Sequence, residues 1–243
     1  MNQEQVGTLW GVGVGPGDPE LITLKTARLL KTCPVVAFPA GRGGAQGIAQ
    51  RIVAKLLQPQ QQQLPLIFPF VQEAAVLESA WQVAAQAVWQ HLQQGQDVVF
   101  ATEGDAGFYS TFTYLAQTLQ ALCPAAVIKT VPGICSPMAA AAQIGEPLTI
   151  LQQRLTVLPA LYAIADLETA LDQADVVVLM KVASVYGQVW PILKRKQLLH
   201  RSCVVVRATQ ADEEIYDDLS GLPDLQLPYF SLMIINCGGH SLN

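Results

Sequence analysis

Short apolar runs alternate with stretches of helical periodicity along the first half of the chain. The runs that predict buried strands cover residues 8–14, 34–39, 65–70, 97–102 and 125–131. Between them, apolar residues recur at helical spacing within 19–33, 47–57, 71–95 and 108–122. Strands that alternate with helices form mostly parallel sheets, so the first half predicts a doubly wound α/β domain.

Two stretches of this half give finer expectations about burial. In the helix predicted over 19–33, four apolar residues fall on one face: Leu21, Leu24, Ala27 and Leu30. The glutamine-rich stretch 58–63 is of low complexity, and we expect it to be exposed.

A second series of elements follows. Strands are predicted at 154–160, 175–182, 202–209 and 228–236, with helices at 166–174 and 185–196. The turn VPGICSP separates the two series, so the predicted domains are 1–131 and 132–243.

Composition supports a globular protein and excludes several classes of partner. The 243 residues are 51% apolar and 14% charged, with a net charge of −5 and a mean hydropathy of +0.31. No block of Lys and Arg is present, which argues against nucleic-acid binding. The apolar runs have the length of strands and are too short to span a membrane. The first residues lack a basic start and an apolar stretch, so we expect a cytoplasmic protein.

Cysteine and histidine spacing argues against a metal centre or a disulfide framework. The five cysteines form no C-x-x-C pair, and the three histidines form no H-E-x-x-H motif. We therefore expect no protein-bound metal and reduced cysteines that pack as small apolar residues.

The glycine-rich stretch GVGVGPGDPE (11–20) follows the first predicted strand and could accept a ligand close to its backbone. A dinucleotide fingerprint needs G-x-G-x-x-G, but the third glycine position is Pro16 or Asp18. The next strand ends in Pro39, without the acid that would hold a ribose, and no P-loop motif is present. What remains is a stiff turn that exposes backbone and Asp18, or simply a turn whose acid caps a helix.

Two further loops have the same strand–turn–helix form. In ATEGDAGFYSTF (101–112), Glu103 and Asp105 flank Gly104, with Phe108 and Tyr109 behind them. In TVPGICSP (130–137), a glycine permits a sharp turn before the small residues Cys135 and Ser136. Ligands of open α/β sheets bind at the carboxyl ends of strands, so the three loops can line one crevice.

The three loops contain no phosphate-binding lysine, no Ser–His–Asp set and no metal cluster. Backbone groups, small residues and carboxylates suit S-adenosylmethionine, whose sulfonium can be held by carbonyl and carboxylate oxygens. Methyl transfer mainly requires alignment of the donor with the acceptor.

Five motifs together resemble one family, the tetrapyrrole methylases of cobalamin and siroheme synthesis. They are GVGVGPGDPELITLK, EGDAGFYSTF, VPGICS, DVVVLMKV and VVVRAT. Within that family, TEGDAGFYSTF together with YFSLMII is most similar to the precorrin-2 C(20)-methyltransferases, the cobalt-factor II form included.

The resemblance implies a homodimer of chains with two α/β domains, an open cleft between the domains and S-adenosylmethionine in that cleft. The first domain would lie on the tetrapyrrole side, and the second would complete the cofactor site. The implied cofactor contacts are Pro16, Glu103, Gly104, Asp105, Phe108, Cys135, Ser136, Met180 and Ala208.

The substrate would be precorrin-2 or cobalt-factor II, methylated at C-20. Its carboxylates require a local basic lining, for which Arg42, Lys181 and Arg207 are the candidates, although the loop around Arg42 could be a mere linker. Tyr109 would contact the substrate or only pack. Proton loss would be assisted by Glu103, by Asp18 or by solvent.

Two departures from the family pattern bear on these roles. Ala106 stands where the family commonly has proline, which would loosen the second loop. Some relatives carry an acid at the end of the second strand, where this chain has Pro39, so their proposed base is not carried over. A sister methylase acting at another carbon, a methylase of protein side chains and a non-enzymatic S-adenosylmethionine sensor remain alternatives.

Overall fold

The computed structural model describes residues 6–41, 45–69, 71, 73–159 and 164–238. The chain divides into two units, Met1–Cys135 and Ser136–Asn243. Each unit is an α/β domain with its own sheet and its own core. None of the described helices is long and apolar enough to cross a membrane.

The first unit is built on a five-stranded sheet whose order is β3-β2-β4-β1-β5. All neighbouring strands are parallel. The strands are β1 (Thr8–Gly13), β2 (Val35–Pro39), β3 (Gln62–Leu66), β4 (Val98–Thr102) and β5 (Val127–Val131). This sheet confirms the predicted doubly wound α/β fold.

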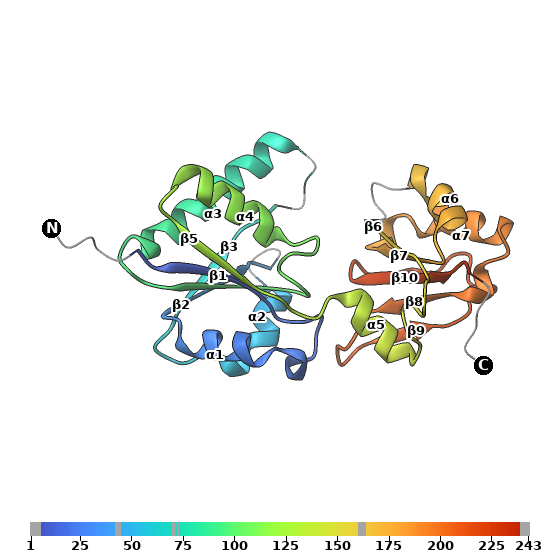
Figure 1. The fold of residues 1–243 in the computed structure, drawn as a ribbon, viewed down its shortest axis with the longest axis horizontal. Coiled ribbons are helices and arrows are strands. Elements are labelled where there is room, and N and C mark those ends of the chain that lie inside the picture. The colour runs from blue at the N-terminus through green and yellow to red at the C-terminus, as the bar shows by residue number, and fades with distance from the viewer. Residues whose placement is uncertain (1–5, 42–44, 70, 72, 160–163, 239–243) are drawn as a thin grey trace. The chain divides into compact units, whose positions relative to one another are not determined.

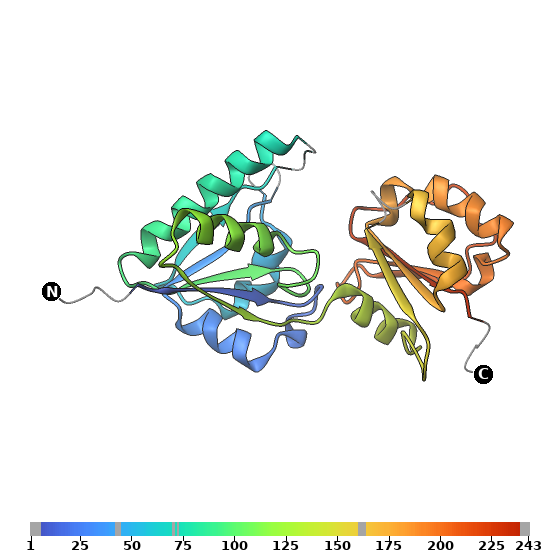
Figure 2. The same cartoon turned by 45° about the horizontal axis from the view of Figure 1, so that its top comes forward.

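Helices cover both faces of this sheet (Figures 1 and 2). On one face lie α1 (Leu24–Thr32) and α2 (Ile48–Val53), which pack on side chains such as Val36 and Phe38. On the other lie α3 (Ala74–Leu92) and α4 (Thr111–Leu122), packed on Leu9 and Phe100. Because the central strands are buried on both faces, their sequences are continuous apolar runs.

The first helix begins later than its apolar pattern predicts. Pro19–Leu21 form a separate 3-10 turn, and α1 starts only after Thr23, whose hydroxyl accepts a hydrogen bond from the Thr26 N–H. The residues of α1 that are buried are Thr26, Leu29 and Leu30. Leu24, the first residue of the helix, is 92% exposed, so it does not share a buried face with Leu30.

The third strand was predicted a few residues too late, since the structure places it at Gln62–Leu66 rather than at 65–70. The glutamine-rich stretch thus runs into an edge strand. It is also not fully exposed: the Gln61 amide donates hydrogen bonds to the carbonyls of Leu30 and Cys33, at 2.7 and 2.6 Å. Repetitive polar composition hid a side chain that satisfies two carbonyls at the end of α1.

The second unit has a mixed sheet of order β6-β7-β10-β8-β9, in which only β6 and β7 are parallel. Its strands are β6 (Leu155–Pro159), β7 (Val176–Met180), β8 (Ser202–Val206), β9 (Glu214–Tyr216) and β10 (Ser231–Asn236). The sequence pattern missed β9, because a three-residue strand between polar residues carries almost no periodicity.

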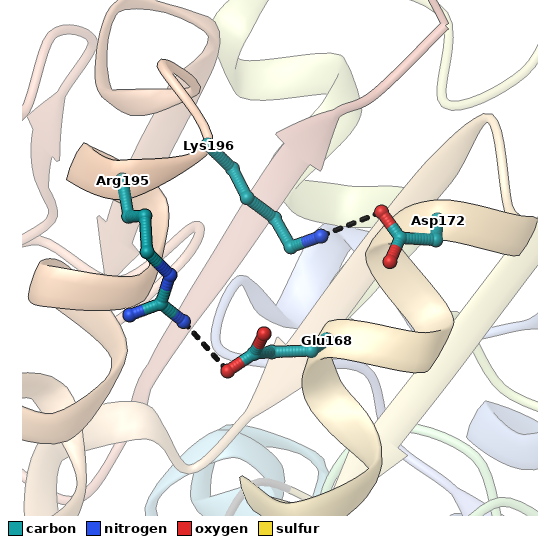
Figure 3. A network of polar contacts seen from close by, with 4 residues as sticks. All are labelled: Glu168, Asp172, Arg195 and Lys196. Carbon is teal, nitrogen blue, oxygen red and sulfur yellow. Dashed lines mark hydrogen bonds and ion pairs between the residues drawn. The ribbon is translucent and has the colours of Figure 1, made fainter.

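Helices again cover both faces of the second sheet (Figure 1). Small residues of α5 (Ser136–Ile144) pack on Val178 and Ile234. The opposite face is covered by α6 (Ile164–Gln173) and α7 (Tyr186–Arg195). Two ion pairs join these helices at their outer surface: Arg195 with Glu168 at 2.6 Å, and Lys196 with Asp172 at 2.5 Å (Figure 3).

Candidate functional site

The carboxyl ends of β1 and β4 form the topological switch point of the first sheet. These strands are neighbours, with Gly13 opposite Thr102, but the helices that follow them lie on opposite faces. Such a point leaves a crevice outside the strand ends where α/β proteins bind ligands. Three segments meet there, and we call them loop 1 (14–18), loop 2 (103–110) and loop 3 (132–135).

Loop 2 is joined to loop 1 through the backbone. The Gly104 N–H donates to the Gly15 carbonyl at 2.8 Å, and the Gly15 N–H donates to the Gly104 carbonyl at 3.2 Å. Both glycines have positive φ, +66° and +77° respectively, a conformation that costs glycine little. The two predicted ligand loops are therefore held together before any ligand binds.

Asp105 joins loop 2 to loop 3. Its Oδ2 accepts a hydrogen bond from the Gly133 N–H at 2.8 Å, and its Oδ1 accepts one from the Gly107 N–H at 2.7 Å. Both carboxylate oxygens thus bind backbone amides of the site. Charge-assisted hydrogen bonds of this kind are stronger than neutral ones, so Asp105 fixes the shape of both loops.

Glu103 reaches in the other direction. Its Oε1 accepts a hydrogen bond at 3.1 Å from the Ala49 N–H in the first turn of α2. The N-cap residue of α2 is Gly47, which offers no side chain for capping. Glu103 therefore supplies, from a distant part of the chain, a cap that the local sequence lacks.

Two glycines, Gly13 and Gly133, lie closer to the Gly104 carbonyl than any other residue could. A Cβ on Gly133 would lie 2.3 Å from the Gly104 carbonyl oxygen, and a Cβ on Gly13 would lie 2.5 Å from that same oxygen. Neither contact is sterically possible without movement of the backbone. The spacing of glycines in the motifs thus reflects backbone packing between loops 1, 2 and 3.

The aromatic pair of loop 2 lies just before α4. The rings of Phe108 and Tyr109 are edge to face, with centroids 4.8 Å apart. Tyr109 has a φ of +50°, which is unusual for a residue with a side chain, and its side chain is 50% exposed. Behind it, the Ser110 hydroxyl accepts a hydrogen bond from the Phe112 N–H and bonds the buried Thr102 hydroxyl.

The second unit carries a different set of unusual residues at its strand ends. Lys181 follows β7, while Arg207 and Thr209 follow β8, and all three have positive φ: +59°, +49° and +66°. The predicted cofactor residues Met180 and Ala208 lie directly beside them in the sequence. Left-handed backbone at residues other than glycine is costly and concentrates at ligand sites.

The two cations of this region have different surroundings. The Lys181 ammonium lies 5.5 Å from the centre of the Tyr229 ring. Arg207 Nε donates to Asp212 at 2.9 Å, whereas its buried Nη1 has no hydrogen-bond partner among the described residues. The backbone N–H of Arg207 donates to the Phe230 carbonyl, so both cations lie near the segment that enters β10.

The remaining sequence-predicted residues fall at defined places. Pro16 is buried in loop 1, and the Asp18 carboxylate accepts a hydrogen bond from the Glu20 N–H at 2.8 Å. Cys135 ends loop 3, and Ser136 begins α5. Arg42 lies outside the described residues.

The cysteines behave as packing residues. All five are free. Burial raises the pKa of Cys33 to about 12 and the pKa of Cys203 and Cys237 to about 11, so these thiols stay protonated near neutral pH. Among the described residues, no group of His, Cys, Asp and Glu could hold a metal ion.

Comparison with known proteins places this arrangement in a family. The model of the Tetrapyrrole (Corrin/Porphyrin) Methylases matches residues 8–223, which is most of the chain. The chain belongs to the tetrapyrrole methylase family. The resemblance inferred from the five motifs is thereby confirmed.

Curated tetrapyrrole methylases are similar over nearly the whole chain. The cobalt-precorrin-2 C(20)-methyltransferase of Salmonella typhimurium is 34% identical over 95% of this chain and 96% of its own length. The cobalamin biosynthesis protein CobIJ of Mycobacterium tuberculosis is 35% identical over 96% of this chain. The match covers 46% of CobIJ, so this chain spans about half the length of that relative.

Solved tetrapyrrole methylase structures share the fold. The uroporphyrin-III C-methyltransferase of Thermus thermophilus, complexed with S-adenosylhomocysteine, superposes with a TM-score of 0.67. That match covers 95% of this chain and 97% of the other, at 23% identity. The predicted class, two α/β domains of the tetrapyrrole methylase type, is confirmed at the level of the fold.

Sequence reasoning missed some residues that shape the candidate site. Ala49 contributes only its backbone N–H, and no side-chain pattern could indicate that role. Gly13 was noted as part of the glycine-rich stretch, yet its close contact with Gly104 and Gly133 depends on strand order. Thr209 could not be singled out either, because a positive φ at a residue other than glycine leaves no mark in the sequence.

Proposed function

We propose that the chain catalyses S-adenosylmethionine-dependent methylation of precorrin-2, or of cobalt-factor II, at C-20 in cobalamin biosynthesis. The support is family membership together with a relative of matching length that bears the name cobalt-precorrin-2 C(20)-methyltransferase. The observation that carries the proposal furthest is the joining of loops 1, 2 and 3 through the consecutive residues Gly104 and Asp105.

The residues present suit the methyl donor. Loops 1 to 3 offer glycine-lined backbone and small residues, and Phe108 adds an aromatic ring that can contact an adenosyl group. The expected contacts in the second unit, Met180 and Ala208, flank left-handed residues whose strain is typical of ligand sites. When bound, S-adenosylmethionine supplies an activated methyl group on its sulfonium.

Catalysis would rest on what the chain itself fixes. Holding donor and acceptor in line removes most of the entropic barrier to a bimolecular reaction. The hydrogen bonds of Asp105 and Gly104 fix the loops in advance, so little ordering is needed when the ligands bind. Their role would be to orient the reactants and to exclude water.

The acidic tetrapyrrole must be attracted locally, because the chain has a net charge of −5. We propose that Lys181, Arg207 and Arg42 bind its carboxylates and that Tyr109 contacts the macrocycle. Lys181 is the best placed of the described cations, since its ammonium lies over the Tyr229 ring and pairs with no carboxylate among the described residues, whereas Arg207 pairs with Asp212.

The decisive experiment uses methyl-labelled S-adenosylmethionine and a panel of reduced tetrapyrroles, each with and without cobalt. NMR of the product should show the label on C-20 of precorrin-2 or its cobalt complex. Label on another carbon would make the chain a sister methylase. Binding of S-adenosylhomocysteine without any transfer would favour a sensor and refute the proposed reaction.

We also propose that the enzyme is a cytoplasmic homodimer. The four buried residues of α3 all lie in the second half of the helix. The first half carries exposed apolar side chains, which support a second copy of the chain as the partner. Within Ala74–Val83 the only charged residue is Glu78, and the exposed side chains include Val76 and Val83. Two copies of an acidic protein can meet on such a weakly charged patch with little repulsion.

Sedimentation measures the proposed dimer directly. Val83→Glu should shift the chain to monomer, whereas Leu122→Glu, which adds the same charge to an exposed residue at the end of α4, should not. A monomeric parent protein would refute the dimer. A dimer that survives Val83→Glu would place the interface elsewhere.

A further inference from the structure

Three consecutive residues of loop 2 each hold a different neighbouring segment. Glu103 holds the first turn of α2, Gly104 holds loop 1, and Asp105 holds loop 3. Loop 2 follows β4, and β2 and β1 are the two neighbours of β4 in the sheet. The tripeptide thus connects segments that follow strands on both sides of β4.

Glu103 links β4 to the chain after β2 at a point where the two strands no longer pair. β2 and β4 pair only from Val35 opposite Val98 to Ala37 opposite Phe100, although both strands continue beyond these residues. Beyond Ala37 and Phe100, no further backbone pairing joins the ends of β2 and β4. The bond from Glu103 to Ala49 is the next connection between β4 and the chain that follows β2.

The bond also satisfies a buried donor. Ala49 is 0% exposed, and the N–H groups of the first helical turn have no partner within the helix. Without Glu103, this N–H would be left buried and unbonded, which is costly. The carboxylate oxygen is therefore engaged in a structural bond of its own.

The anchored turn lies next to the glycine-rich segment that contains Arg42. The described residues that precede 42–44 are in close contact with those that follow. A Cβ on Gly41 would lie 2.3 Å from the Ala45 carbonyl oxygen, and a Cβ on Gly47 would lie 2.3 Å from the Pro39 carbonyl oxygen. Glu103 thus holds the first turn of α2 beside described residues that already pack closely on one another.

We propose that Glu103 is a positioning residue, which anchors the first turn of α2 to loop 2, and that it is not the proton acceptor of the reaction. The kinetic part of this assignment rests on the proposed function, whereas the structural part does not. A residue that positions backbone and transfers no proton should lower kcat less than loss of a general base would.

Two substitutions at Glu103 separate anchoring from proton transfer. In Glu103→Gln, the side-chain amide oxygen can still accept from the Ala49 N–H, but the side chain cannot take a proton. In Glu103→Ala, both capacities are lost. An anchoring role predicts that glutamine rescues what alanine destroys, while a base predicts that both variants fail.

Amide hydrogen exchange tests the anchor without substrate. The Ala49 amide should exchange about tenfold faster or more in Glu103→Ala, as expected for loss of a hydrogen bond to a charged acceptor. It should stay protected in Glu103→Gln and in the exposed control Glu78→Ala. Unchanged protection in Glu103→Ala would overturn the anchor, whether or not the chain methylates a tetrapyrrole.

Kinetics then tests the assignment. Glu103→Gln should keep kcat within about 10²-fold of the parent, with the pH profile of kcat unchanged, because general bases typically contribute about 10²–10⁴-fold. Glu103→Ala should lose more kcat/KM than Glu103→Gln, because only alanine removes the acceptor of the Ala49 N–H. A Glu103→Gln enzyme that binds both ligands but loses kcat beyond that limit, together with the acid limb of its pH profile, would make Glu103 the base.

Discussion

The two units differ in the residues that occupy unusual backbone positions at their strand ends. In the first unit, Gly13 and Gly133 have no side chain, so that the end of β1 and loop 3 pack against the backbone of loop 2 at Gly104. In the second unit, Lys181, Arg207 and Thr209 keep their side chains and adopt the left-handed conformation instead. Glycine would adopt that conformation with less strain.

This difference separates the two kinds of requirement on a site. Where a side chain is absent, the close approach of the loops is the requirement. Where a side chain is kept at a cost of order 1–3 kcal/mol per residue, the side chain itself is the requirement. We infer that the strand ends of the first unit are selected for backbone packing and those of the second unit for their side chains.

The largest effect is expected from adding one methyl group to the first unit. Gly133→Ala places a Cβ 2.3 Å from the Gly104 carbonyl oxygen, so loops 2 and 3 must move apart. Overpacking of this kind typically costs about 1–3 kcal/mol of folding stability. Urea unfolding should show that loss, and calorimetry should show that S-adenosylhomocysteine binding is abolished or weakened at least about tenfold.

The matched control is Gly187→Ala in α7. An added Cβ there meets nothing within 4 Å, and alanine is the better helix former. Its stability should rise by about 0.4–1 kcal/mol, with unchanged S-adenosylhomocysteine affinity. Equal effects of the two substitutions would remove backbone packing as the reason for the glycines.

A slightly smaller effect is expected at Asp105. Asp105→Asn keeps one acceptor oxygen but points an NH₂ group at one of two amide donors, those of Gly107 and Gly133. The unpaired donor should cost about 1–3 kcal/mol of stability and weaken S-adenosylhomocysteine binding. If calorimetry and urea unfolding both give parent values, the bonds of Asp105 do not hold the site together.

Much of the fold follows from the sequence because burial on both faces leaves a strong signal. The run DVVVLM and the pattern of α7 predicted β7 and its neighbouring helix within two residues of their observed bounds. Where a short local bond intervenes, the pattern fails. Thr23 caps α1, which starts later than predicted, and Leu24 at its first position is exposed; apolar periodicity registers neither.

The candidate site was predictable only as a set of loops. The sequence indicates that Glu103, Gly104 and Asp105 follow a buried strand, but not which distant backbone group each one holds. Those partners depend on strand order, which brings segments after β1, β2 and β5 to the same edge of the sheet. From the sequence alone, a carboxylate that binds a distant amide cannot be distinguished from one that binds a ligand.

The contrast between the units predicts that Lys181 can become glycine without loss of stability. Lys181→Gly relieves left-handed strain, so urea unfolding should show equal or slightly higher stability. Loss of the half-buried charge should raise the KM for the tetrapyrrole about two- to fivefold, as expected for a partly exposed ionic contact. Added salt should reduce the difference between variant and parent.

Gln197→Gly is the matched control, because Gln197 has a φ of +58° and is exposed beyond the end of α7. It should show the same stability change as Lys181→Gly, with no change in the KM for the tetrapyrrole. A KM that rises equally in both variants would deny Lys181 a role in binding substrate. A large loss of stability in Lys181→Gly alone would assign the lysine to packing on Tyr229.

The smallest effect is expected at the ion pairs between α6 and α7, which lie on the outer surface of the second unit (Figure 3). The side chains of Arg195 and Glu168 are 59% and 52% exposed, so water and salt screen their attraction. Glu168→Gln should therefore lower the free energy of unfolding by less than about 1 kcal/mol. A larger loss in urea unfolding would show that the second unit depends on surface charge for its stability. In that case, the change in KM caused by Lys181→Gly could not be assigned to substrate binding alone.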